Sequence, residues 1–187
     1  MDSFEQVVAA VLHRQGYWLL PSLKIDLSKG EKRRIGRHSS PRWEIDIVAY
    51  DATANHVIAV ECKSYMDSSG VQVATFAGSN LLDQARYKMF FEPKLRRVVL
   101  AALGRQLVNR GFCRRNPRIT LGLAAGKIKG DKKWLKRYFM KRNWHLFTPD
   151  DLCLALSEMS DEGYENSVAA MVAKLLLRNT TSLRRDA

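Results

Sequence analysis

The N-terminal residues carry apolar side chains at helical spacing. Apolar positions recur every three or four residues, at Phe4, Val7, Val8, Val11 and Leu12. Ser3 and Gln6 have the spacing of a capping box, and Gly16 suits the end of a helix. The pattern therefore predicts a helix from about residue 3 to residue 15.

The next segments have the pattern of strands. Residues 17–20 and 23–27 are extended in character, with Pro21 between them limiting strand pairing. A strongly basic loop is expected at 28–41. Residues 43–50 alternate apolar and acidic positions, 51–55 form a turn, and 57–63 are apolar almost to their end, as in a buried strand.

The second half alternates helical and extended patterns. Helices are predicted at 71–90, 105–114, 131–142 and 164–177, with strands at 95–102, 118–124 and 144–147. Thr148, Pro149 and Asp151 predict the start of another helix. This order predicts an α/β fold with a central mixed β-sheet flanked by helices and a helical C-terminal extension. We expect one domain over 1–178, with its core at 1–126 and its helical part at 127–178, and a flexible tail at 179–187.

Charge points to a polyanionic partner. The 187 residues include 31 Lys and Arg against 19 Asp and Glu, a formal net charge of +12. Nucleic acid has the densest negative charge among common partners, and an anionic membrane surface competes with it. No apolar run is long enough to span a bilayer, so we expect no membrane segment. The three cysteines have no zinc-ligand spacing, which favours a reducing cytoplasm.

Three charged residues stand at the ends of the two apolar strands. Alternation places Glu44 and Asp46 on one face, with Trp43, Ile45 and Ile47 facing a core on the other side. On the following strand Glu61 and Lys63 share a face, and Val60 and Cys62 take the other. A short turn joins the strands, so we expect Asp46, Glu61 and Lys63 to meet.

Such a group has the chemistry that phosphodiester hydrolysis needs. Two carboxylates can hold Mg²⁺ or Mn²⁺, since these cations prefer oxygen ligands. The cation polarises the phosphoryl oxygen and lowers the pKa of water, and a nearby lysine orients the nucleophile or stabilises charge. The backbone carbonyl of Cys62 is a further candidate ligand.

Asp46 followed by Glu61-Cys62-Lys63 resembles the motif of the PD-(D/E)XK, or restriction-endonuclease-like, superfamily. The similarity covers roughly residues 4–102. It implies a metal-dependent nuclease acting on DNA, with Asp46 and Glu61 as metal ligands and Lys63 positioning the attacking water. Glu5, in the first helix, would support the metal site. The chain departs from the motif in having Ile45 where the family name implies proline.

Plainer interpretations exist for each residue. Asp46, Glu61 and Lys63 could form a cross-strand ion pair. Glu5 could be a favourable charge in the first turn of a helix, and Glu44 a solvated strand residue. For the whole chain, the alternatives are a catalytically inactive nucleic-acid-binding protein and a basic interaction subunit on the same fold.

Two basic stretches are candidate nucleic-acid contacts. The first leads into the Asp46 strand and contributes Lys32, Arg33, Arg34, Arg37 and Arg42, and the second contributes Lys132, Lys133, Lys136 and Arg137. Contacts of this kind fix the position of a phosphate backbone without reading its sequence. A homodimer is also plausible, because two sites would cut two strands.

Overall fold

The computed structural model describes residues 1–36, 43–80, 82–163 and 166–183. At its centre is a five-stranded sheet in the order β1-β2-β3-β5-β7. Its strands are β1 (Trp18–Ile25), β2 (Trp43–Asp51), β3 (His56–Lys63), β5 (Arg118–Ala125) and β7 (His145–Phe147). The expected mixed sheet is confirmed: β1, β2 and β3 are antiparallel neighbours, whereas β3, β5 and β7 run parallel.

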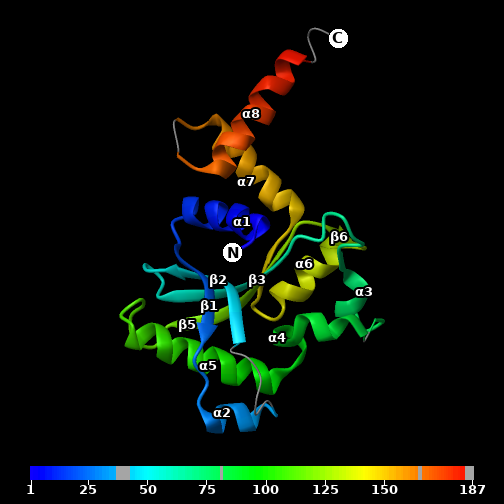
Figure 1. The fold of residues 1–187 in the computed structure, drawn as a ribbon. Helices are drawn as coiled ribbons and strands as arrows, with labels where there is room; N and C mark the ends of the chain where they lie inside the picture. Colours follow the sequence, from blue (N-terminus) through cyan, green and yellow to red (C-terminus); the bar gives the residue numbers. More distant parts are fainter. Residues whose placement is uncertain (37–42, 81, 164–165, 184–187) are drawn as a thin grey trace.

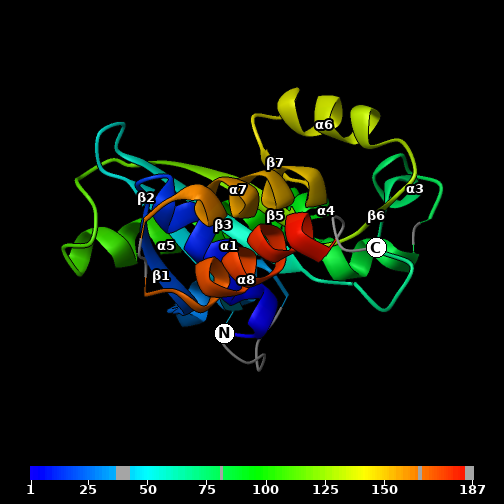
Figure 2. The same cartoon turned by 90° about the horizontal axis from the view of Figure 1, so that it is seen from above.

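Helices cover both faces of the sheet (Figure 1). On one face lie α1 (Ser3–Arg14), α7 (Pro149–Asp161) and α8 (Val168–Leu183), whose apolar residues pack with Ile47, Ile58 and Val60. On the other face lies α5 (Pro93–Asn109), together with α3 (Val73–Phe76), α4 (Lys88–Phe91) and α6 (Lys132–Met140). The view from above shows α1, α7 and α8 stacked over the strands (Figure 2). The result is a helix–sheet–helix sandwich.

The predicted strand at 95–102 is wrong, because these residues form most of α5. The adjacent β-branched residues Val98 and Val99 favour a strand. The buried residues nevertheless recur at helical spacing, at Leu95, Val99, Ala102, Leu103 and Leu107. The predicted helix at 105–114 is the continuation of α5 as far as Asn109. This helix is part of the crossover connection that the parallel strands β3 and β5 need.

The predicted helix at 71–90 is also wrong as a single element. Val71–Gln72 form β4, which pairs in parallel with β6 (Ile128–Lys129) in a small second sheet. After α3 the chain turns at Gly78, whose φ of 86° suits glycine, and continues as the short helix η1 (Leu82–Tyr87) and α4. Pairing with a segment more than fifty positions away overrides the local helical pattern.

The helix ends follow capping chemistry with one correction. The N-cap of α1 is Asp2, not Ser3, and its partner is Glu5 rather than Gln6. At α7 the predicted cap is confirmed, since the Thr148 side chain accepts from the Asp151 backbone and Asp151 returns the bond. Part of the predicted basic loop is instead helix α2 (Lys29–Arg34), capped by Ser28.

The C-terminal helix is longer than its pattern predicted. Helix α8 begins at Val168 and extends to Leu183, so the first part of the predicted tail is helical in backbone. Residues 184–187 lie outside the described residues. In the described part of the chain, no helix has the length and apolar character needed to cross a membrane.

Candidate active site

The candidate site lies where β2 and β3 separate. Their pairing ends at Ile47 and Val60, one position short of Asp46 and Glu61. Beyond that point the Cys62 N–H donates to Asp46 Oδ2 at 2.8 Å, in place of a backbone bond to β2. The Asp46 carboxylate therefore accepts a hydrogen bond that a backbone carbonyl would accept in a regular strand pair. This bond fixes Asp46 beside the end of β3.

The alternation of β2 is interrupted at Asp46, which corrects one expectation. Ile45 and Val48 pack in the core on the α5 face, whereas Ile47 and Ala49 pack on the α1 face. Trp43, Ile45 and Ile47 therefore do not share a face. Ser22 stands opposite Asp46 in the register of β1 and has a φ of 48°, so the partner strand is distorted at the same place. Asp46 accordingly points into the gap between strands.

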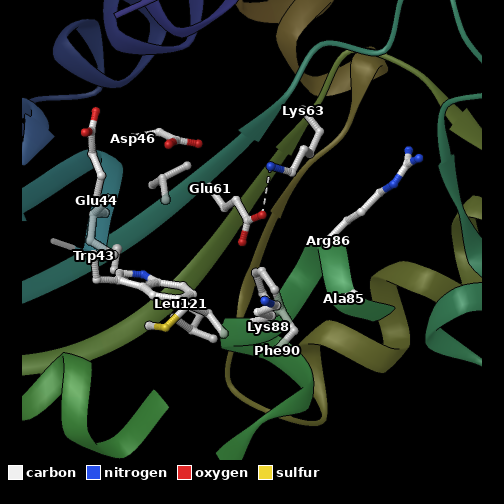
Figure 3. Close-up of a pocket in the computed structure, with 14 residues that line it drawn as sticks. Trp43, Glu44, Asp46, Glu61, Lys63, Ala85, Arg86, Lys88, Phe90 and Leu121 are labelled. Carbon is white, nitrogen blue, oxygen red and sulfur yellow. Dashed lines mark ion pairs between the residues drawn. The ribbon is translucent and has the colours of Figure 1, made fainter. Parts of the chain in front are cut away.

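Glu61 and Lys63 lie on one face of β3, as expected. Glu61 Oε1 and Lys63 Nζ form an ion pair at 2.9 Å, with side chains 22% and 23% exposed (Figure 3). Val57 and Ala59 precede them on this face, and Val60 and Cys62 belong to the opposite one. The pair thus replaces core apolar residues at the point where the strand reaches solvent.

Burial makes the charged forms of both acids costly. It raises the pKa of Glu61, with Lys63 opposing the increase and Asp46 adding to it. Burial also raises the pKa of Asp46, against the opposing effects of the Cys62 N–H and Lys63. For Lys63, burial lowers the pKa, but Glu61, with smaller contributions from Asp46 and Tyr65, opposes it and the net pKa is raised. Two desolvated carboxylates with one ammonium leave the group short of positive charge.

Asp46, Glu61 and Lys63 open into one pocket of about 290 Å³. Figure 3 shows two further cations there, Arg86 and Lys88, which come from η1 and α4 on the other side of the pocket. Sequence patterns gave Arg86 no role, because it lies in a segment expected to be one continuous helix. The available signal is Gly78, which interrupts the predicted helix at 71–90 and separates Arg86 from the residues before it.

The donors around Asp46 and Glu61 suit a hard divalent cation. The N–H and C=O of one residue point to the same side of a strand, so the Cys62 carbonyl faces the same side as its N–H, toward Asp46. Among the described residues, no group of three or more His, Cys, Asp or Glu is positioned to hold a metal. Mg²⁺ needs only one or two carboxylates with water and substrate oxygens, so this donor set fits it.

Glu5 has a defined structural role. Its Oε2 accepts from the Asp2 N–H at 3.0 Å, and the Glu5 N–H donates to Asp2 Oδ1 at 2.8 Å, which completes the cap of α1. Glu5 is not among the residues that line the pocket. Burial raises its pKa, and Asp46 is near enough to add to that increase. The plainer interpretation of Glu5 explains its contacts, and its support of a metal stays a prediction.

Among the described residues, some cations of the two basic stretches form ion pairs and others are exposed. On α6, Lys132 pairs with Asp150 at 3.0 Å and Lys136 with Asp151 at 2.9 Å, whereas Lys133 and Arg137 are exposed. Lys32, Arg33 and Arg34 lie on α2, which Figure 1 places beyond α5. Arg37 and Arg42 lie outside the described residues.

Comparisons with protein-family models, curated proteins and solved structures gave no match to this chain.

Proposed function

We propose that this chain is a divalent-metal-dependent nuclease that hydrolyses phosphodiester bonds, in DNA. One observation carries the proposal: Asp46, held by the Cys62 N–H at the separation of β2 and β3, opens into the same pocket as the Glu61–Lys63 pair. The mixed sheet flanked by helices agrees with the restriction-endonuclease-like core that the motif implies.

Each residue then has a defined task. Asp46, Glu61 and the Cys62 carbonyl would hold the cation. When bound, Mg²⁺ or Mn²⁺ would polarise the phosphodiester and lower the pKa of the attacking water. Lys63 would orient that water and stabilise negative charge on the phosphate. Arg86 and Lys88 face the pocket from the other side, where they would contact the phosphate backbone.

The Glu61–Lys63 ion pair is compatible with this assignment. Its separation of 2.9 Å uses Glu61 Oε1, and a carboxylate has a second oxygen for another cation. A positive charge beside Glu61 and Asp46 also offsets the burial that raises both pKa values. The same arrangement would be hard to explain as a stabilising ion pair, because desolvation cancels much of the gain.

A cleavage assay tests the proposal. Supercoiled plasmid, linear duplex and single strands are incubated with the protein in Mg²⁺, Mn²⁺ or EDTA, alongside Asp46→Asn. The exposed Asp67 is a charge-matched control, since it lies outside the pocket. We expect metal-dependent cutting that is lost in Asp46→Asn and retained in Asp67→Asn.

Two other results would contradict the proposal. DNA binding without cutting under either metal would favour the inactive nucleic-acid-binding protein. Equal cutting by wild type and Asp46→Asn would show that the activity comes from elsewhere.

A further inference from the structure

A second hollow, lined by arginines, lies next to α4, which also borders the candidate site. Its volume is about 380 Å³, and its lining includes Arg96 and Arg97 from α5, Arg142 after α6, and Trp144. It opens beside residues 119–121 of β5, a part of that strand that β7 does not pair with, since pairing begins at Gly122. Of the described residues that line it, none is acidic.

Aromatic rings and carbonyl groups hold two of the guanidinium groups. Arg96 donates to the carbonyls of Met89 and Phe90 at 3.1 Å each and lies 5.1 Å from the centre of the Trp144 ring. Arg142 lies 3.6 Å from the centre of the Tyr138 ring and 5.8 Å from that of Trp144. These contacts fix the direction of the side chains without cancelling their charge.

Acidic side chains do not offset the charge of the three arginines in the described part of the chain. Within the described part of the chain, no carboxylate forms an ion pair with any of the three. Burial lowers the pKa of Arg96, Tyr138 opposes this decrease, and the like charge of Arg142 adds to it. Arg97 is exposed at the mouth. A bound anion would relieve this repulsion, and planar guanidinium groups match phosphate oxygens in geometry.

The hollow is connected to the candidate site through α4. Met89 and Phe90, whose carbonyls Arg96 binds, also line the pocket of Asp46, Glu61 and Lys63. In the other direction, Arg97 also lines a neighbouring hollow with Arg34, Lys94 and Glu31, the last of which is paired with Arg105. Cations therefore continue from one side of α4 to the other and onward to α2.

We propose that the pocket of Arg96, Arg97 and Arg142 binds a backbone phosphate of the nucleic acid, away from the bond that is cut. This inference rests on the proposed function for its ligand. Such a contact gives affinity and register without sequence preference. It makes binding depend on length, because a short oligonucleotide in the candidate site would not reach across α4.

Binding is measured in EDTA, so that cleavage plays no part. Fluorescence anisotropy follows labelled oligonucleotides of increasing length with wild type, Arg97→Gln, Arg142→Gln and the double variant. Arg115→Gln is the control, because it removes the same charge from an exposed residue outside the hollow. Circular dichroism checks the fold, and the exposed Arg97 has no partner to lose among the described residues.

We expect the double variant to bind long oligonucleotides about tenfold more weakly, with short ones unchanged. The salt dependence of log K should lose about 0.7 to 0.9 for each phosphate contact removed. Equal losses in Arg115→Gln, or no loss in the double variant, would overturn the inference. So would a mononucleotide that binds the wild type as tightly as a long oligonucleotide, since it would assign the pocket to a free phosphate.

The outcomes separate this inference from the nuclease proposal. Weaker long-oligonucleotide binding in the variants, without cutting by any form of the protein, would keep the phosphate pocket and end the nuclease proposal. Metal-dependent cutting together with wild-type affinity in the double variant would support the nuclease proposal and overturn the phosphate pocket.

Discussion

Lys63 is the residue whose role is most sharply defined by its contacts. It is one of the three cations lining the pocket, and it alone pairs with a candidate metal ligand. Glu61 keeps it charged by raising its pKa. A lysine held in this state cannot act as a general base at neutral pH, so under the proposed function its contribution would be to orient water and stabilise charge.

Replacing Lys63 by alanine should therefore reduce cleavage by at least about 100-fold while DNA affinity in EDTA stays within about threefold. The reason is that one ammonium among many cations adds little to binding but acts directly on the transition state. Single-turnover cleavage and anisotropy measure the two effects. A loss of affinity that matches the loss of rate would contradict the assigned role.

The buried carboxylates predict how metal and pH act together. Burial raises the pKa of Asp46 and of Glu61, so protons compete with a cation at a higher pH than for exposed acids. The Mg²⁺ concentration for half-maximal cleavage should rise as the pH is lowered from about 7 to about 5. Excess Mg²⁺ should restore part of the rate. A half-maximal concentration that does not change with pH would contradict this.

At the scale of elements, the end of β3 depends on a close backbone approach. Gly126 follows β5, and its N–H donates to the Lys63 carbonyl at 2.9 Å. A Cβ at this position would overlap the Ser64 carbonyl oxygen, which belongs to the backbone and has little freedom to move. Glycine is therefore required here by contact with the strand that carries the site.

Gly126→Ala should displace the end of β3, lower the melting temperature and reduce cleavage by about tenfold or more, since small displacements of catalytic groups are costly. Gly30→Ala in α2 is the matched control. No atom lies within 4 Å of a Cβ there, and alanine favours helix by about 0.5–1 kcal/mol. Melting curves and cleavage rates of both variants test the difference. Similar behaviour of the two would contradict it.

Three strands meet at a histidine that stays neutral. His56 of β3 is 4% exposed, its Nε2 lies 2.8 Å from Thr120 Oγ1 of β5, and its ring centre is 5.4 Å from that of His145 of β7. Burial lowers the pKa of His56 to about 4, with Arg118 and His145 adding to the effect. Burial among the parallel strands thus disfavours the protonated, charged form of the His56 ring at neutral pH.

A folded-state pKa below the unfolded value of about 6.5 means that stability is present above pH 6.5 and lost as the pH falls toward 4. We expect the melting temperature to fall by several degrees over that interval. His56→Gln should flatten this dependence, even if it lowers stability at pH 7. His13→Gln, at an exposed position on α1, should keep it. An unchanged slope in His56→Gln would contradict the prediction.

On the scale of the whole molecule, the net charge of +12 includes some cations that form ion pairs and others that do not among the described residues. Several cations form ion pairs with carboxylates, as in Lys132–Asp150, Lys136–Asp151 and Arg105–Glu31. Arg96 and Arg97 on α5 and Arg142 after α6 form no ion pair with a carboxylate among the described residues. If the chain binds nucleic acid as proposed, the cations without acidic partners among the described residues, rather than the net charge, would set the number of phosphate contacts.

Binding to duplex DNA should weaken steeply with salt. Four or more phosphate contacts correspond to a slope of log K against log salt of about −4 or steeper. Titrations at about 50 to 200 mM salt measure it. A slope near zero would favour the alternative of a basic interaction subunit.

The sequence by itself determined the features that depend on near neighbours in the chain. Alternation predicted β2, a continuous apolar run predicted β3, the short turn between them predicted that Asp46, Glu61 and Lys63 meet, and Thr148 predicted the start of α7. Each of these rests on a strand pattern, a hairpin turn or a cap, whose energetics involve residues a few positions apart.

Only the tertiary structure decided what depends on distant partners. The segment at 95–102 became helix because it crosses between parallel strands, and residues 71–72 became a strand because 128–129 pair with them. Asp46 lies in the gap between β2 and β3, where the alternation of β2 is interrupted and Ser22 of β1 has a positive φ. The arginine hollow exists because α5, β5 and the end of α6 meet. Packing among distant segments outweighs local preferences of about 1 kcal/mol or less per residue, so such features are invisible until the chain is folded.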